Sequence, residues 1–190
     1  MSIGEELRSR LTQIRMIAFD VDGVLTQGDI IYTDTGEEAK AFNVKDGLGI
    51  RVAAEAGLRL VLITGRASSM VQRRARDLHI TDFLQRIGDK ASALRAFAEH
   101  EGIPLEQTAF VGDDVNDREA MRICGVSIAP ADAVPEIREQ ADLVTEARAG
   151  RGAARQAIEA ILRAQGRWEQ AVDQYLAGLA ERDRARRTET

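Results

Sequence analysis

The sequence predicts an α/β protein in three layers, with a mostly parallel, Rossmann-like sheet that carries helices on both faces. Short apolar runs alternate with segments of helical periodicity along most of the 190 residues, as in consecutive strand–helix units. Polar residues follow four of these runs, as expected where parallel strands end and open sheets bind ligands. A β-hairpin flap and a C-terminal tail helix complete the predicted architecture.

The predicted strands begin with the apolar run Met16–Phe19. The hairpin is predicted from two runs of alternating polarity, 29–32 and 39–44, on either side of the turn-forming residues Asp34-Thr35-Gly36-Glu37. The other predicted strands are residues 58–63, 83–87, 109–111, 126–129 and 142–144.

Helix starts and ends are predicted from capping residues. Ser2-Ile3-Gly4-Glu5 has the pattern of a capping box before a short first helix. Asp46 is predicted to cap a helix that ends at Gly57, and Asp89 one that ends at Gly102. The remaining predicted helices are 68–78, 116–124, 135–140, 151–164 and 168–180, the last followed by a frayed polar end.

The length and composition fit one globular domain. We assign residues 1–165 to it, with the flap at about 28–44, and residues 166–190 to the tail. A net charge of −5 gives no reason to expect a nucleic-acid partner, and no apolar run is long enough to cross a membrane. The single cysteine, Cys124, excludes an internal disulfide. We expect a cytoplasmic enzyme or binding protein.

The acidic pair Asp20 and Asp22 follows the first strand directly. Two like charges at a buried strand end are unfavourable unless a cation or a proton compensates them. Taken alone, the pair has a second interpretation as a turn and a helix cap, because Asp-Gly is common in turns.

Three further polar signals follow other predicted strands: Thr64-Gly65-Arg66, Lys90 and Gly112-Asp113-Asp114. The carboxyl ends of parallel strands share one edge of a sheet, so we expect these groups to converge with Asp20. Asp20 is ionised at neutral pH and could attack phosphorus without a base, and Mg²⁺ with oxygen ligands would offset the repulsion. Lys90 and the Thr64 hydroxyl could bind the phosphoryl oxygens.

These motifs resemble those of the haloacid dehalogenase (HAD) superfamily of phosphatases. The segment 20–26 matches the first motif, Thr64 the second, Lys90 the third and the segment 112–117 the fourth. The resemblance implies that Asp20 is the nucleophile and that Asp22 acts as general acid and base. It also implies a Mg²⁺ site formed by Asp20, the backbone carbonyl of Asp22 and Asp113, supported by Asp114 and Asp117.

Three segments, 36–50, 63–66 and 149–155, resemble the superfamily branch of 3-deoxy-D-manno-octulosonate 8-phosphate (KDO 8-phosphate) phosphatases. This resemblance implies a small phosphorylated acidic sugar as substrate. The chain departs from the branch at Arg86, where the branch usually has glycine, and in its longer tail after Trp168. The candidate substrate contacts are Asn43, Lys45, Asp46, Gly65, Arg66, Arg86 and Arg151, with Arg155 as a further candidate.

Several of these candidates also have structural interpretations. Asp46 is first of all a helix cap, and the arginines could equally form a solvated helix face. Arginine nevertheless suits planar anions such as a substrate carboxylate.

The spacing of the motifs leaves no room for a cap domain. About forty residues separate Asp22 from Thr64 and twenty-six positions separate Thr64 from Lys90, which the required helices already occupy. The pocket would then be open to water, and the hairpin offers an edge for pairing between copies. By resemblance, we expect a homotetramer in which a neighbouring subunit covers the active site.

The leading hypothesis is therefore a Mg²⁺-dependent phosphatase without a cap domain that acts on KDO 8-phosphate. One alternative is the same chemistry on a nine-carbon acylneuraminate phosphate or another small phosphomonoester. A second alternative, from another class, is a regulatory or assembly subunit that keeps the fold without turnover.

Overall fold

A six-stranded parallel sheet forms the centre of the molecule, as the sequence predicts. In the computed structural model, which describes residues 4–36 and 38–188, the strand order is β5-β4-β1-β6-β7-β8. All five neighbouring pairs of strands run parallel. The strands are β1 Met16–Phe19, β4 Arg59–Ile63, β5 Asp82–Leu84, β6 Thr108–Val111, β7 Val126–Ala129 and β8 Leu143–Val144.

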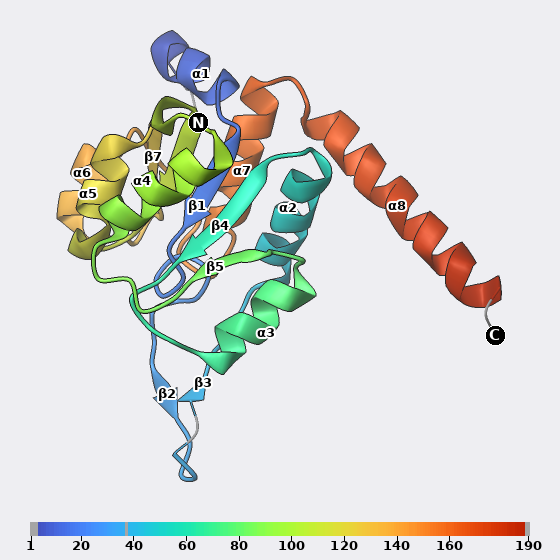
Figure 1. The fold of residues 1–190 in the computed structure, drawn as a ribbon, viewed down its shortest axis with the longest axis horizontal. Helices are drawn as coiled ribbons and strands as arrows, with labels where there is room; N and C mark the ends of the chain where they lie inside the picture. The colour runs from blue at the N-terminus through green and yellow to red at the C-terminus, as the bar shows by residue number, and fades with distance from the viewer. Residues whose placement is uncertain (1–3, 37, 189–190) are drawn as a thin grey trace.

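Helices cover both faces of this sheet (Figure 1). Successive residues of a strand point to opposite faces, so β1 supplies Ile17 and Phe19 to one hydrophobic core and Met16 and Ala18 to the other. Helices α1 Glu5–Thr12, α2 Val44–Glu55, α3 Ser69–Asp77 and α7 Ala153–Ala164 line the first core, and α4 Lys90–Glu101, α5 Arg118–Ile123 and α6 Pro135–Gln140 line the second. Two short 3₁₀ turns, Leu105–Gln107 and Val115–Asp117, flank β6.

The hairpin is shorter than predicted. Its strands are β2 Ile31–Tyr32 and β3 Glu38–Ala39, which pair antiparallel, so the predicted strand over 39–44 is wrong beyond Ala39. Glu37 of the predicted turn lies outside the described residues. The hairpin extends away from the body of the protein (Figure 1), and its apolar residues Ile30, Ile31 and Tyr32 are exposed.

Most predicted helix boundaries hold, and α4 starts after Asp89 and ends at Gly102 as expected. The predicted capping box depends on Ser2 and Ile3, which lie outside the described residues, and α1 starts after Gly4. The last helix is longer than the predicted 168–180, because α8 runs from Trp168 to Thr188, and the frayed end stays a prediction.

The prediction that Asp46 caps its own helix is also wrong. Asn43 is the N-cap of α2, and its side chain accepts a hydrogen bond from Lys45 N at 2.8 Å. The buried Asp46 carboxylate instead accepts from Gly152 N at 3.1 Å and Arg155 N at 2.9 Å, so it caps α7. Such a contact across 106 sequence positions joins the two helices.

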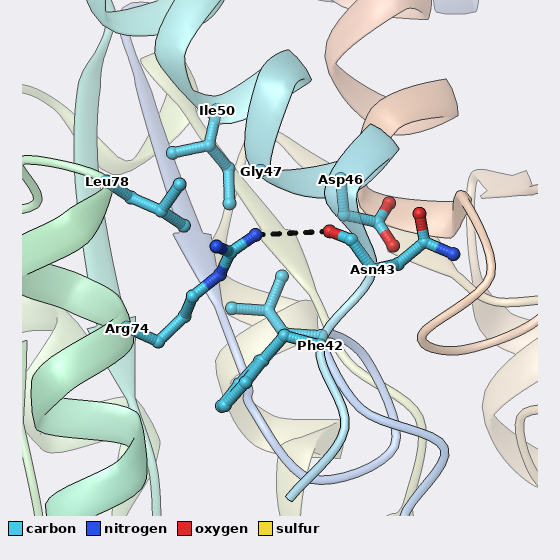
Figure 2. Close-up of a pocket in the computed structure, with 8 residues that line it drawn as sticks. Phe42, Asn43, Asp46, Gly47, Ile50, Arg74 and Leu78 are labelled. Carbon is cyan, nitrogen blue, oxygen red and sulfur yellow. Dashed lines mark hydrogen bonds between the residues drawn. The ribbon is translucent and has the colours of Figure 1, made fainter.

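Arg74 of α3 fixes the chain where the hairpin enters α2. Its guanidinium donates to the backbone oxygen of Asn43 at 3.1 Å and lies 5.8 Å from the centre of the Phe42 ring (Figure 2). Gly47 makes this possible, since a Cβ there would lie 2.2 Å from an Arg74 nitrogen. The segment after the hairpin is therefore held against the body of the protein.

Helix α8 packs on α2 and α7, and Arg182 well along it still lies 3.6 Å from Glu55 Oε1 of α2, before the helix continues past the body (Figure 1). Trp168 is buried at the start of α8, where the guanidinium groups of Arg155 and Arg163 lie 4.6 and 5.4 Å from its ring centre. The division into a domain of residues 1–165 and a tail of 166–190 stays a prediction. Across the described part of the chain, no helix combines the length and the apolar character that a membrane span requires.

Candidate active site

Four loops meet at the carboxyl edge of the central strands. Asp20 follows β1, which lies between β4 and β6, and these two strands lead into Thr64 and Asp113. Lys90 is the first residue of α4, which follows β5. The predicted convergence of Asp20, Thr64, Lys90 and Asp113 at one edge of the sheet is therefore present.

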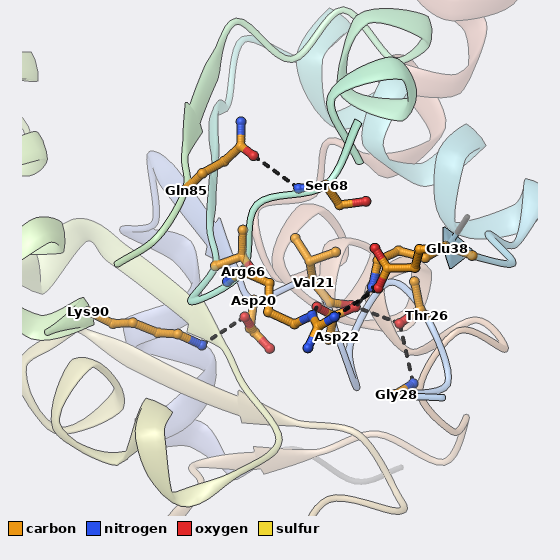
Figure 3. Close-up of polar contacts among 12 residues, drawn as sticks. Asp20, Val21, Asp22, Thr26, Gly28, Glu38, Arg66, Ser68, Gln85 and Lys90 are labelled. Atoms are coloured by element: carbon orange, nitrogen blue, oxygen red, sulfur yellow. Dashed lines mark hydrogen bonds and ion pairs between the residues drawn. The ribbon is translucent and has the colours of Figure 1, made fainter. Parts of the chain in front are cut away.

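Lys90 is buried and bridges two carboxylates. Its ammonium nitrogen donates to Asp20 Oδ1 at 2.7 Å, as Figure 3 shows, and to Asp117 Oδ1 at 2.5 Å. Burial acts to lower the pKa of Lys90, but the charges of Asp20 and Asp117 outweigh it and raise the pKa above its ordinary value. Lys90 is thus a fixed positive charge beside Asp20.

Asp20, Asp113 and Asp117 form a cluster of carboxylates. Each offers an oxygen within 4.8 Å of the oxygens of the other two. Burial, followed by the charge of Asp117, raises the pKa of Asp20 to about 6 in spite of Lys90. Burial and the charges of Asp20 and Asp117 raise the pKa of Asp113 to about 8. At neutral pH, Asp113 therefore keeps its proton and Asp20 is mostly ionised; a cation bound by the cluster would displace the proton on Asp113.

The cluster fits a divalent cation such as Mg²⁺, which prefers oxygen ligands. Among the side chains that the structure describes, Asp113 has a buried oxygen, Oδ1, without a hydrogen-bond partner. Its other oxygen lies against Gly23, where a Cβ would come within 2.0 Å of Asp113 Oδ2. Gly23 also has a φ of +100°, which favours glycine. The turn after Asp22 therefore leaves room for the Asp113 carboxylate.

Asp117 and Asp114 hold the loop that carries Asp113. Asp117 is fully buried, and its Oδ2 accepts from Asp113 N at 3.0 Å while Oδ1 binds Lys90. Asp114 is exposed and accepts from Val115 N at 2.7 Å as the cap of the 3₁₀ turn. These contacts fix the loop that carries Asp113; the supporting function of Asp114 and Asp117 at a metal site stays a prediction.

The Asp22 carboxylate lies outside this cluster and faces the hairpin. Lys40 donates to its Oδ1, and Arg66 Nε is 3.9 Å from its Oδ2. Arg66 also donates to Glu38 Oε1 at 3.0 Å, the contact drawn in Figure 3. Neither Lys40 nor Glu38 was a candidate site residue from the sequence; the signal available was the position of these two charged residues within the predicted flap of about 28–44.

The loop after β4 is held by a hydrogen bond within it and by hydrogen bonds to the segment after β5. Thr64 is buried, its Oγ1 accepts from Arg66 N at 3.3 Å, and its carbonyl accepts from Ile87 N at 3.0 Å. Gln85 Oε1 accepts from Ser68 N at 3.2 Å, visible in Figure 3, and joins the two loops. Gly65 is exposed between Thr64 and Arg66.

The other candidate substrate residues have varied surroundings. Asn43 and Asp46 cap helices, whereas Lys45 and Arg151 are exposed, Arg151 in a surface hollow with Gln27 and Asp29. Arg86 is exposed with a φ of +58°, a left-handed conformation that favours glycine. Their contacts with substrate stay predictions.

Arg155, the further candidate, is engaged elsewhere. Its Nε donates to Glu159 Oε1 at 2.6 Å, and its guanidinium stacks on Trp168. These contacts give it a structural function at the start of the tail.

Comparisons with known proteins agree with this architecture. The sequence model of the haloacid dehalogenase-like hydrolases matches residues 79–156. The 3-deoxy-D-manno-octulosonate 8-phosphate phosphatase KdsC of Escherichia coli is 40% identical over 174 residues, which are 92% of this chain and 93% of KdsC.

Solved structures of similar proteins have the same fold. The KDO 8-phosphate phosphatase of Moraxella catarrhalis, in complex with magnesium, phosphate and KDO, superposes with a TM-score of 0.86 at 38% identity over 90% of this chain and 98% of that one. A cobalt-bound phosphatase of the same kind from Haemophilus influenzae gives a TM-score of 0.81 at 38% identity over 84% and 93% of the two chains.

The parallel sheet and the loops at its carboxyl edge define a haloacid dehalogenase-like hydrolase, and the chain is a member of that superfamily. Within it, the chain belongs to the family of the 3-deoxy-D-manno-octulosonate 8-phosphate phosphatases.

Proposed function

We propose that the protein is a Mg²⁺-dependent phosphatase that hydrolyses KDO 8-phosphate, a precursor of lipopolysaccharide, through an aspartyl-phosphate intermediate. The observation that carries the proposal is the cluster of Asp20, Asp113 and Asp117 beside the buried Lys90, in a chain 40% identical to KdsC over nearly its whole length. A protein that only binds a partner has no need of this arrangement, so the cluster disfavours the regulatory-subunit alternative.

In the proposed reaction, an oxygen of Asp20 attacks the phosphorus atom and the bond to the sugar oxygen breaks. Asp22 gives its proton to that leaving oxygen, and then takes a proton from the water that hydrolyses the aspartyl phosphate. Mg²⁺, held by Asp20, the Asp22 carbonyl and Asp113, would neutralise negative charge on the phosphate.

Thr64 and Lys90 assist Asp20 and Asp22 in this proposal. The Thr64 hydroxyl and the backbone near Gly65 bind phosphoryl oxygens, and Lys90 keeps Asp20 in the attacking position. Asp117 keeps Lys90 and the Asp113 loop in place through the hydrogen bonds described above.

For the sugar, we propose recognition by the charged side chains around the site. Arg66 is about half exposed beside Asp22, and Arg151 is exposed in the nearby hollow, so both are suited to a carboxylate. Arg86, Lys45 and Asn43 are further candidates, whereas the Asp46 carboxylate is engaged by α7. The added charge of Arg86 is the feature that supports an acylneuraminate phosphate as the alternative substrate.

We further propose a homotetramer in which a neighbouring subunit covers the open site. The exposed Ile30, Ile31 and Tyr32 of the hairpin support this assembly, because contiguous apolar residues on a protruding edge favour self-association. Light scattering tests it: a monomeric mass with full activity would contradict the proposal.

A cytoplasmic location is part of the same proposal, because a phosphorylated acidic sugar is charged and does not cross membranes unaided. Fractionation of cells that express the chain would check it.

The decisive experiment is a phosphate-release screen over sugar phosphates that compares kcat/KM for KDO 8-phosphate, an acylneuraminate 9-phosphate and simple phosphomonoesters. We expect the highest value for KDO 8-phosphate, loss of activity in EDTA and recovery with Mg²⁺. Release from none of these compounds, under conditions in which the protein is folded and binds Mg²⁺, would favour the regulatory subunit.

A further inference from the structure

The hairpin places a buried lysine on the Asp22 carboxylate. The Lys40 side chain is only 1% exposed, and its ammonium group pairs with Asp22 Oδ1. Lys40 follows β3 directly, so the contact joins the hairpin to the loop after β1. A buried ammonium group loses its hydration and is stable only with anionic partners. The contact therefore restricts the position of the Asp22 carboxylate.

Glu38 and Arg66 complete a network of four charges. Lys40 Nζ is 3.4 Å from Glu38 Oε1, which also accepts from Arg66 at 3.0 Å, and Arg66 Nε is 3.9 Å from Asp22 Oδ2. The order around the network is anion, cation, anion, cation, so each charge lies between two opposite ones. Burial acts to raise the pKa of Glu38, but Lys40 and Arg66 together keep it below its usual range.

The two oxygens of Asp22 therefore face cations from two different elements. Lys40 comes from the hairpin and Arg66 from the loop after β4, so Asp22 can rotate only if one of these contacts breaks. General acid catalysis requires the acid to lie within hydrogen-bond distance of the leaving oxygen, and small displacements are costly.

We propose that Lys40 is a positioning residue that orients Asp22 for proton transfer to the leaving oxygen. This inference rests on the proposed function, in which Asp22 is the general acid and base. Lys40 itself does not bind substrate, because its ammonium group is buried between Asp22 and Glu38. The hairpin thus contributes to the chemistry through Asp22.

The test compares two leaving groups in Lys40→Met, measured in single turnovers with enzyme in excess and with Mg²⁺. A sugar alkoxide needs a proton as it leaves, whereas p-nitrophenolate leaves as a stabilised anion. We expect phosphoenzyme formation to slow at least about tenfold with the sugar phosphate and less than about threefold with p-nitrophenyl phosphate. The KM from separate steady-state assays should stay within about threefold for both substrates, because Lys40 does not contact the substrate.

Arg95→Met is the matched control, since it removes one cation from an exposed position on α4. Its rates should equal those of the unmodified protein with both substrates. Glu38→Gln is the second variant, used because the loss of a buried lysine can impair folding. It keeps the side-chain shape and loosens Lys40, and the rate of phosphoenzyme formation at saturating substrate should show a smaller loss with the same preference for p-nitrophenyl phosphate. Because Arg66, the other partner of Glu38, is a proposed sugar contact, an effect that comes from Arg66 would appear as a higher KM for the sugar phosphate.

Chemical rescue separates the ammonium group from packing. Lys40→Cys treated with 2-bromoethylamine regains an ammonium group at the length of lysine, and we expect the sugar-phosphate rate to recover. Because position 40 is itself buried, the reagent is applied in urea before refolding with Mg²⁺, in a Cys124→Ser background in which the protein that keeps Lys40 should not react. Mass spectrometry checks both points.

An equal loss with both substrates in folded Lys40→Met and Glu38→Gln, or no loss with either, would overturn the inference while leaving the phosphatase proposal intact. If the unmodified protein with Mg²⁺ releases phosphate from neither substrate, the proposed function fails and this inference fails with it.

Discussion

The affinity of the protein for Mg²⁺ should depend steeply on pH, because two carboxylates of the cluster hold protons that the cation must displace. The pKa of Asp113 is about 8 and that of Asp20 is about 6. At pH 6, about 1% of Asp113 and about half of Asp20 are ionised; at pH 8, about half of Asp113 and nearly all of Asp20 are. The fraction with both ionised rises by roughly two orders of magnitude, which corresponds to on the order of 3 kcal/mol in binding free energy.

Isothermal titration calorimetry of metal-free protein with Mg²⁺, in several buffers between pH 6 and 8, measures both the affinity and the protons released. Asp114→Asn sharpens the test, because the Asp114 charge contributes to the raised pKa of Asp113. In this variant the rise in affinity should occur at lower pH. Glu119→Gln, an equal charge change on the exposed face of α5, is the control and should leave the curve in place.

The same pKa shifts predict the stability of the metal-free protein. Both folded-state pKa values are raised, so the folded protein keeps protons that the unfolded chain loses above about pH 4. Its free energy of unfolding should therefore fall as the pH rises from about 4 to about 8, and saturating Mg²⁺ should reverse the loss. An affinity for Mg²⁺ that is flat between pH 6 and 8, with no proton release, would refute this reasoning.

Three substitutions give further predictions. Asp20→Asn should lower kcat by about 10³-fold or more while circular dichroism shows an unchanged fold; near-normal turnover would exclude Asp20 as the nucleophile. Gly23→Ala should abolish Mg²⁺ binding measured by calorimetry and lower the unfolding free energy by about 1–3 kcal/mol, since the new Cβ meets Asp113 and the φ of +100° is strained; unaltered binding would contradict the close approach. Asp46→Ala should lower the unfolding free energy by about 1–2 kcal/mol in urea titrations through loss of the α7 cap, and a rise in KM at unchanged stability would instead support a substrate contact.

The sequence by itself determined the sheet, most helices and the position of the chemistry. Apolar runs and capping residues such as Asp89 are local signals, and a carboxylate that directly follows a buried strand lies at the strand's end whatever the rest of the chain does. For this reason Asp20, Thr64, Lys90 and Asp113 could be assigned to one edge before any coordinates.

Only the tertiary structure decided which partner each polar side chain has. Asp46 has the sequence signature of a cap for its own helix but caps α7, because the two helices pack side by side. Asp22 meets Lys40 only because the chain that returns from the hairpin passes beside the loop after β1, and Asp117 meets Lys90 only because α4 and the turn after β6 converge. A buried charge takes the partner that packing brings within reach, and no local pattern in the sequence encodes that distance.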